Sequence, residues 1–409
     1  MRYETYTLGN GLRVIGLRSA SPVVYCGYVV CAGTRDEAPG EEGMAHFCEH
    51  LSFKGTARRK AVQVLSCLES VGGDLNAFTA KEDTTFHAAV LREHVGRAVG
   101  LLTDIVFHST YPQAEMEREV EVVCDEIESY NDSPAELIYD EFEDVVFAGH
   151  PLGHNILGRA ERLRGYASDD ARRFTRRLYR PDNAVFFVYG DVDFGKVVRL
   201  LERETSDFAP CQPRRGRVGD VSVPPYEPRE LTVDKGTHQA HVMVGCRAYG
   251  AHDPRRMPLY LMNNMLGGPA MSARLNMALR EKRGLVYSVD SSMVCYSDTG
   301  LWCTYFGCDP GDAAKCRRLV GRELDRMAAK PLSEARLQAA KRQIKGQIGV
   351  ACDNREGFAL DFGKSFLHYG REKDIDALFA KIDAVTAQEI QSVAQEMFGG
   401  GNLTTLVFA

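Results

Sequence analysis

The sequence predicts an α+β protein made of two homologous domains, each a mostly antiparallel β-sheet packed with helices. Three observations support this fold class. The chain has 409 residues, more than a single hydrophobic core usually organises. The apolar periodicity disappears near the middle of the chain, over a stretch interrupted by prolines. Finally, SDDARRFTRRLYRPDNAVFFVYG in the first half and TAQEIQSVAQEMFGGGNLTTLVFA at the end of the second share a helix–turn–strand pattern, as two copies of one domain would.

The proline-rich stretch sets the expected domain boundaries. It contains Pro210, Pro213, Pro224, Pro225 and Pro228, a spacing that is typical of a linker. We therefore expect an N-terminal domain at 1–205, a linker at 206–229 and a homologous C-terminal domain at 230–409.

The pattern of apolar and turn residues predicts the elements of the first half. Strands are expected at 5–17, 23–31, 75–80, 84–90 and 184–189. Helices are expected at 43–53, 62–71, 93–108, 113–130, 134–147 and 168–179. The helix at 43–53 follows a turn-rich loop and contains no proline, and Ser168 is the expected N-cap of the last helix.

The second half is expected to follow a similar course. A strand at 241–246 precedes helices at 255–266 and 271–282. Two strands within 286–308 come next, then several helices. The half ends with a strand just after Asn402, as the first half ends with a strand just after Asn183.

Composition and charge exclude several classes of function. With 44% hydrophobic residues, 26% charged residues and a net charge of −6, the chain has the composition of an ordinary globular protein, and no general nucleic-acid-binding surface is expected. The one basic cluster, Arg214, Arg215 and Arg217, is expected to be a solvated part of the linker. No stretch is apolar enough to span a bilayer or to serve as a secretory signal. Neither nucleic acid nor membrane is therefore an expected partner.

The cysteines indicate the compartment. Twelve are scattered singly, with no C-x-x-C pair, which is typical of reduced thiols in a long chain. We therefore expect a cytoplasmic protein.

The motif with the clearest chemistry is HFCEH. His46 and His50 are four residues apart, which on a helix places both imidazoles on one face, within reach of one ion. Zinc accepts imidazole nitrogen readily, and a neighbouring carboxylate, here Glu49, can take a proton from water that the metal has acidified. The pattern indicates zinc-dependent hydrolysis. The alternative is three surface residues that contact one another along a helix.

A hydrolytic zinc site also needs a third protein ligand and an open position. The predicted helix QAEMEREVEVVCDEIESY has an apolar stripe, with Glu119 and Glu126 along one border and Glu117 and Glu128 along the other. The pattern alone does not select among these four. For any one of them the alternative is a solvated acidic face.

Longer segments carry a resemblance to a known family. They are HFCEHLSFKGT, GGDLNAFTAKEDTTFHA, EREVEVVCDEIESYNDSP, HPLGHNILG and LREKRGLVYSV, in order along most of the chain. HFCEH inverts the commoner H-E-x-x-H order and looks like the inverzincin signature of the pitrilysin and insulinase peptidases, in particular the branch that includes the mitochondrial processing peptidases. The resemblance implies the metallohydrolase fold of that branch and one zinc ion per chain.

The same resemblance assigns roles to residues. It implies that His46, His50 and Glu126 bind zinc and that Glu49 is the general base that activates water. Glu119 matches a second family carboxylate, to which we assign the orientation of ligands or water without metal binding.

Two further segments match parts of the family that contact the substrate. Arg280 and Tyr287 match a pair that reaches the active site from a C-terminal domain, where they would hold substrate carbonyls and the oxyanion. Asn76 and Ala77, in LNAFT, resemble the edge strand that captures extended peptides by main-chain pairing. The alternatives are an ion-paired Arg with a core Tyr, and an ordinary sheet strand. In neighbouring segments Ala80, Lys81 and His154 depart from the usual family pattern.

The expected protein is a zinc-dependent endopeptidase that hydrolyses short or unstructured peptides and, by analogy with the family's paired halves, forms a homodimer. Two alternatives remain: a non-catalytic scaffold or processing-complex subunit of the same fold, and one half of a heterodimer. The other histidines fit no metal spacing and are expected to be structural; they are His87, His94, His108, His150, His154, His238, His241, His252 and His368.

Overall fold

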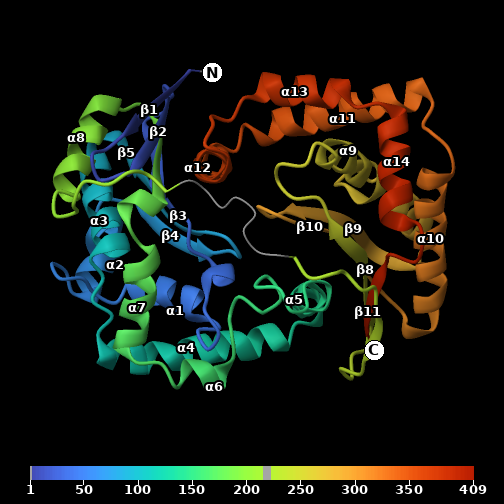
Figure 1. The fold of residues 1–409 in the computed structure, drawn as a ribbon, viewed down its shortest axis with the longest axis horizontal. Helices are drawn as coiled ribbons and strands as arrows, with labels where there is room; N and C mark the ends of the chain where they lie inside the picture. The colour runs from blue at the N-terminus through green and yellow to red at the C-terminus, as the bar shows by residue number, and fades with distance from the viewer. Residues whose placement is uncertain (1, 215–222) are drawn as a thin grey trace. The chain divides into compact units, whose positions relative to one another are not determined.

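The computed structural model describes residues 2–214 and 223–409 and contains a six-stranded and a five-stranded sheet (Figure 1). Unit 1 consists of Met1–Glu128, His154–Arg217 and Ala351–Asp374, and unit 2 of Ser129–Gly153, Val218–Val350 and Ile375–Ala409. These units differ from the continuous domains 1–205 and 230–409 expected from the sequence. The segments 129–153 and 351–374 each pack in the unit that the other half of the chain mainly forms.

The sheet of unit 1 has the strand order β1-β2-β6-β3-β5-β4. Its strands are β1 (Tyr3–Thr7), β2 (Arg13–Arg18), β3 (Val23–Val30), β4 (Asp74–Thr79), β5 (Thr84–Leu91) and β6 (Ala184–Gly190). β2 and β6 are parallel, and the other neighbours are antiparallel. The sheet is therefore mostly antiparallel, as predicted, and β4 forms one of its edges.

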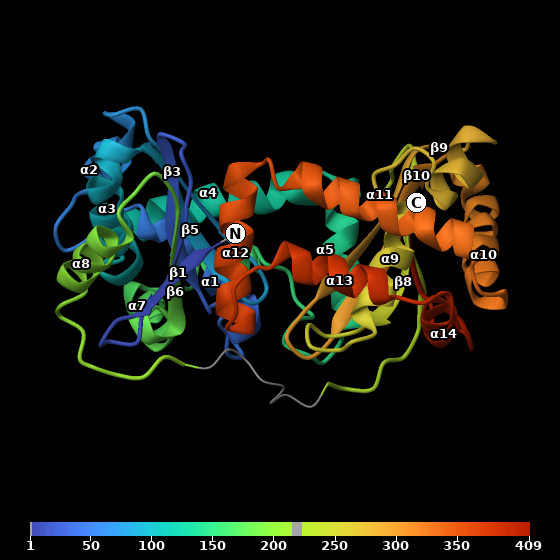
Figure 2. The ribbon, with the colours of Figure 1, turned by 90° about the horizontal axis from the view of Figure 1, so that it is seen from above.

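Helices cover both faces of this sheet. The helices of the larger layer are α1 (Met44–Ser52), α2 (Ala61–Glu69), α3 (Val95–Phe107), α4 (Gln113–Asn131), α7 (Ser168–Leu178) and α8 (Phe194–Glu204), with the short α6 (Ala160–Leu163). Their apolar side chains form the main core with alternate strand residues such as Tyr28 and Phe186. Phe187, which points to the opposite face, contacts Phe362 of α12 (Arg355–Tyr369) at a ring-centroid distance of 6.1 Å. Figure 2 shows the orange-red ribbon of α12 beside the blue strands of this sheet.

The sheet of unit 2 has the order β7-β11-β8-β10-β9. Its strands are β7 (Glu230–Val233), β8 (Ala240–Ala248), β9 (Val286–Cys295), β10 (Gly300–Cys308) and β11 (Thr404–Phe408). On one face, Phe142 of α5 (Pro134–Val146) packs with Met243 and Phe408. The other face is covered by α9 (Arg256–Gly267), the π-helix η4 (Asn276–Glu281), α10 (Ala313–Ala329), α11 (Glu334–Ala351), α13 (Ile375–Ala384) and α14 (Ala387–Phe398).

The two sheets repeat one topology. The order β2-β6-β3-β5-β4 corresponds to β7-β11-β8-β10-β9, and the single parallel pair occupies the same place in both. Both central strands contain a glycine at a close approach: a Cβ on Gly27 would lie 2.3 Å from the Phe86 carbonyl oxygen, and one on Gly245 2.2 Å from that of Trp302. By element order, α1 of unit 1 corresponds to α9 of unit 2.

Several elements differ from the sequence expectation. Ser168 does not cap α7; the N-cap is Ala167, and the Ser168 hydroxyl donates to the Tyr111 carbonyl. The helix expected at 271–282 is mainly the π-helix η4. Helix α8 and the four-residue strand β7 were not expected. α8 has no counterpart in the second half, so the repeat gave no indication of it.

The described parts of the expected linker 206–229 contain no helix or strand, and its centre, 215–222, lies outside the described residues together with Arg215 and Arg217. Arg214 lies 3.3 Å from Asp182. All twelve cysteines are free thiols. Within the described chain, no helix has the length and apolar character needed to cross a membrane.

Candidate metal centre

Helix α1, which carries HFCEH, is held at its N-terminus by a buried carboxylate. Gly43 adopts a left-handed conformation, with φ 86°, just before the helix. The Glu37 carboxylate accepts hydrogen bonds from the backbone N–H groups of Gly43 (3.0 Å) and Ala45 (2.8 Å). His154 lies 2.9 Å from Glu37, and Lys81 donates to the His154 carbonyl. Lys81 and His154, which depart from the family pattern, thus support the start of α1.

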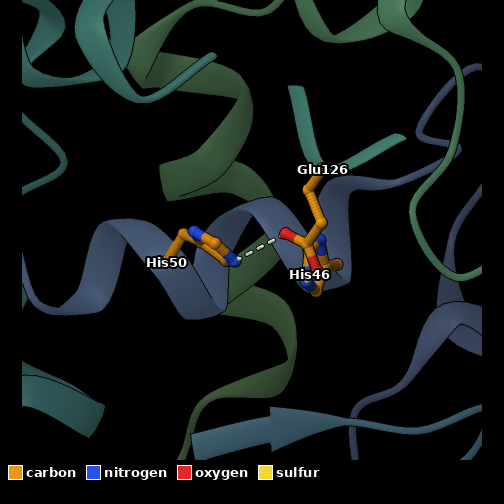
Figure 3. A group of neighbouring side chains, drawn as sticks. All are labelled: His46, His50 and Glu126. Atoms are coloured by element: carbon orange, nitrogen blue, oxygen red, sulfur yellow. Dashed lines mark ion pairs between the residues drawn. The ribbon is translucent and has the colours of Figure 1, made fainter. Parts of the chain in front are cut away.

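The side chains of His46, His50 and Glu126 converge (Figure 3). Both histidines come from α1, and Glu126 comes from α4. Nε2 of His50 lies 3.5 Å from one Glu126 oxygen, and Nε2 of His46 lies 3.9 Å from the other. The three potential ligand atoms all lie within 4.8 Å of one another. Among residues 2–214 and 223–409, no other group of three such side chains meets the same criterion.

Glu119, one helical double-turn before Glu126, contacts His50 from the other side. Its Oε1 lies 3.0 Å from Nδ1 of His50, and its Oε2 lies 2.5 Å from Nζ of Lys54. A carboxylate accepts a hydrogen bond from Nδ1–H, which leaves the lone pair of Nε2 on the side of Glu126. Glu119 therefore fixes the tautomer that a metal ligand needs. Glu117 and Glu128, the other two glutamates that the sequence left open, are not part of the cluster.

Electrostatics distinguish the two histidines. Burial, helped by the positive charge of His50, lowers the pKa of His46 to about 3, so His46 is neutral near pH 7. Burial also disfavours a charged His50, but its hydrogen bond to Glu119 and the charges of Glu49 and Glu126 outweigh this effect and raise its pKa. A neutral imidazole with a free lone pair is the form that binds a metal ion.

Glu49 lies beside the cluster in a buried environment, with 7% of its surface exposed. Burial raises the pKa of Glu49, against the hydrogen bond that Thr79 donates to it. The Thr79 hydroxyl, at the end of β4, lies 2.6 Å from Oε2 of Glu49. This contact holds one carboxylate oxygen and leaves Oε1 for another partner.

Thr79 and Lys54 were missed at the sequence level. Lys54 is four residues after His50, and Thr79 ends the segment LNAFT, so both lie within segments that carried the family resemblance. Neither residue type suggests metal chemistry by itself, and only the packing of β4 and α4 against α1 gives them their contacts.

The residues present fit a zinc ion. Two imidazole nitrogens and one carboxylate are a ligand set that zinc uses in catalytic sites. In addition, the buried Nδ1 of His46 has no hydrogen-bond partner in the part of the chain that the structure describes. Burial keeps this imidazole neutral, and its other nitrogen, Nε2, is the one that faces Glu126, so Nε2 is the atom that can bind a metal ion.

The remaining predicted site residues lie elsewhere. Asn76 and Ala77 are in the middle of β4, at the edge of the sheet of unit 1. Arg280 and Tyr287 belong to unit 2, where the Arg280 guanidinium lies 5.8 Å from the Tyr287 ring centroid. Tyr287 is 87% exposed, so the alternative that it is a core residue is wrong.

Comparison with known proteins adds to this geometry. Residues 13–160 match the insulinase family model, peptidase family M16, and residues 167–344 match the peptidase M16 inactive domain. The chain is 30% identical over 400 residues to an uncharacterized zinc protease of Bacillus subtilis, an alignment that covers 97% of this chain and 95% of that protein. The chain belongs to the insulinase family of peptidases.

A second curated protein and a solved structure are also similar to this chain. An uncharacterized zinc protease of Streptomyces coelicolor is 33% identical over 403 residues, covering 96% of this chain and 86% of that protein. A protease from Helicobacter pylori has the same fold, with a TM-score of 0.89 at 22% identity, and the match covers 100% of this chain and 99% of that one.

The helix that carries the two candidate histidine ligands is present in only one of the two repeats. α9, the counterpart of α1 by element order, has the sequence RMPLYLMNNMLG and contains neither histidine nor glutamate. The chemistry of His46, His50 and Glu126 therefore has no equivalent on α9.

Proposed function

We propose that this chain is a zinc-dependent endopeptidase that hydrolyses short or unstructured peptides. The convergence of His46, His50 and Glu126, with the buried carboxylate of Glu49 beside them, carries this proposal. The non-catalytic alternative is disfavoured because a scaffold needs neither a complete ligand set nor a neighbouring base.

The metal and the side chains have separate tasks. When bound by His46, His50 and Glu126, zinc supplies Lewis-acid activation of a peptide carbonyl and of water. Glu49 accepts a proton at Oε1 while Thr79 holds Oε2, and it returns the proton to the leaving amine. Burial raises the pKa of Glu49, which favours holding the proton between these two steps.

Other residues position the reacting groups. Glu119, itself held by Lys54, keeps Nε2 of His50 free for the metal. Arg280 and Tyr287 are proposed to hold the substrate carbonyl oxygen and the developing oxyanion. We further propose that the protein acts as a homodimer.

The edge strand suggests the class of substrate. β4 is the last strand of its sheet, and an edge strand offers backbone groups to an extended peptide. Asn76 and Ala77 are proposed to pair with such a peptide. An extended backbone is available in short or unfolded chains and not in a compact fold.

Incubation with a mixed peptide library, read by mass spectrometry, tests the proposal. We expect internal cleavage that a chelator abolishes and that added zinc restores. The Glu49→Gln protein, purified in parallel, controls for contaminating proteases. Equal cleavage by wild type and Glu49→Gln, or cleavage that survives full removal of the metal, would show that the proposed site is not responsible.

A further inference from the structure

Unit 2 contains a strongly basic cavity of about 1400 Å³. The segment around η4, the second half of α10 and the start of α11 line it. Seven lining side chains are Lys or Arg, and Glu323 is the one acid among the described lining residues. The chain as a whole has a net charge of −6, so the cavity concentrates positive charge in a protein that is negatively charged overall. The cavity shares no residue with the cluster of unit 1.

Most of the positive charges that line the cavity have no acidic ion-pair partner in the described chain. Glu323 pairs with Arg326. In the described chain, no acid forms an ion pair with Arg274 or Arg336. Burial lowers the pKa of the half-buried Arg274; the charge of Glu323 opposes this effect, and the charges of Arg336 and Arg326 add to it. The like charges that line the cavity repel one another, and a bound anion would offset that repulsion.

The cationic side chains come from three separate elements. Arg274 and Lys282 flank η4, Arg322 is on α10, and Arg336 is in the first turn of α11. A guanidinium group donates two parallel hydrogen bonds to phosphate oxygens. α11 has 18 residues, and its N-terminus, with Ser333 lining the cavity, adds the positive end of a helix dipole.

The cavity also has an apolar part. Met277, Leu319 and Leu332 line it together with the cations, and its volume exceeds that of most small-molecule sites, which hold ligands in about 300–1,000 Å³. We propose that this cavity binds a phosphate-bearing anion, either inorganic polyphosphate or the polyphosphate chain of a nucleotide. This site rests on the charge and shape of unit 2 alone and does not depend on the proposed peptidase activity.

Calorimetric titration of the full chain with inorganic tripolyphosphate tests the proposal. The protein is first freed of metal, because tripolyphosphate chelates zinc and would otherwise give a signal from the metal centre. We expect saturable binding at one site that weakens as the salt concentration rises. The double variant Arg274→Gln, Arg336→Gln should raise the Kd at least tenfold.

A matched control removes the same charge elsewhere on the same helices. Arg318 of α10 and Arg342 of α11 are exposed and do not line the cavity, so Arg318→Gln, Arg342→Gln should change the Kd less than threefold. If circular dichroism shows that the first double variant is misfolded, Arg322→Gln with Lys282→Gln, both at exposed positions, replaces it with the same expected loss.

Further ligands separate the sources of phosphate. Tighter binding of ATP than of tripolyphosphate, with no binding of adenosine, assigns the site to a nucleotide; equal binding of the two assigns it to inorganic polyphosphate. The proposal is overturned if tripolyphosphate gives no saturable binding up to about 1 mM at low salt. An equal loss of affinity in both double variants, or tighter binding of an oligoglutamate peptide than of tripolyphosphate, would overturn it as well.

Discussion

Glu49 and Glu126 are carboxylates of the same centre in different environments. Glu49 is buried and accepts a hydrogen bond from Thr79, whereas 45% of the Glu126 side chain is exposed and faces both histidines. Glu49→Gln keeps the shape and the contact with Thr79 but cannot accept a proton. We expect unchanged zinc content and a kcat lower by about 10²–10⁴-fold. Elemental analysis and a peptide assay on the same sample measure both, and full activity with full zinc would contradict the role of Glu49 as base.

Glu126→Gln should act on the metal itself. Replacing the carboxylate by an amide removes the one negative charge assigned to the ligand set. Substitution of a residue that only supports a ligand lowers metal affinity roughly 10–100-fold, and the loss of the ligand itself should lower the affinity for zinc by more than that. Competition with a zinc-binding dye gives this affinity. Glu128→Gln, at an exposed position on the same helix, is the matched control and should leave it unchanged. Equal affinities in both variants would place the third ligand elsewhere.

Thr79 is a positioning residue, and two substitutions separate its hydroxyl from its shape. Thr79→Val keeps the volume but removes the donor to Glu49, and we expect kcat to fall about tenfold or more, since a hydrogen bond to a charged group contributes roughly 1.5–3 kcal/mol. KM and zinc content should not change. Thr79→Ser keeps the hydroxyl and should retain most of the activity. If Ser and Val variants are equally impaired, the methyl group and not the hydroxyl matters.

At the scale of elements, α12 is tied to the β4–β5 hairpin through Asp83. The Asp83 carboxylate lies 2.7 Å from Nζ of Lys364 and 2.9 Å from Nε2 of His368, both on α12. Lys364 also lies over the ring of Phe78 in β4. Asp83→Asn should therefore lower the free energy of unfolding by about 2 kcal/mol, measured by urea denaturation. Asp74→Asn, at an exposed position in the same hairpin, is the control and should have little effect. Equal losses of stability in the two variants would show that the contacts with α12 are not the cause.

The same contact predicts a dependence on pH. Burial raises the pKa of Asp83, but the hydrogen bond from His368 and the charge of Lys364 more than offset it, so the pKa lies below its ordinary value. A lowered pKa in the folded state gives stability that is present above the unfolded value of about 3.9 and is lost as the pH falls through the folded value. The difference in unfolding free energy between wild type and Asp83→Asn should have its full value at about pH 5 and shrink below about pH 4. A difference that grows with acidity would have the wrong sign.

The elements that sequence reasoning predicted well are those with a strong local pattern. The helix at 43–53 and the strand at 184–189 agree with α1 and β6 to within a residue at each end. Helices α5 and α12, which each pack in the unit that the other half of the chain mainly forms, could not be assigned to their units from the sequence. An apolar face shows that a helix packs against something, but it does not show which sheet the helix covers. A π-helix at η4 has no recognised local signature, and its wider turn reflects its surroundings.

The candidate centre was predictable in part for a similar reason. The spacing of His46 and His50 follows from helical geometry, so the pattern alone placed them together. The choice among four glutamates on α4 depends on how that helix packs across α1, which periodicity does not contain. The structure brings Glu126 and Glu119 to the histidines, in agreement with the family resemblance, while their roles stay a prediction.

At the scale of the whole molecule, the chain contains two copies of one sheet topology, but α1 carries two candidate metal ligands and its counterpart α9 carries none. The second repeat instead carries Arg280 and Tyr287. The Arg280 guanidinium lies 5.8 Å from the centroid of the Tyr287 ring, and Tyr287 is exposed. An exposed Tyr beside an Arg is available to a substrate or to another chain. Under the proposed function, the two copies contribute different residues to catalysis, and the proposed homodimer would supply both sets to each site.

The last prediction is that Arg280 and Tyr287 serve the metal centre of the partner chain. Glu49→Gln lacks the base, and the variant Arg280→Ala, Tyr287→Phe lacks the substrate-holding pair, so each should be inactive alone. In a mixed dimer, one of the two sites would combine an intact Glu49 with an intact Arg280 and Tyr287, and part of the activity should return. Native mass spectrometry shows whether mixed dimers have formed. If they have formed and remain as inactive as either parent, the pair acts within its own chain or has no part in catalysis.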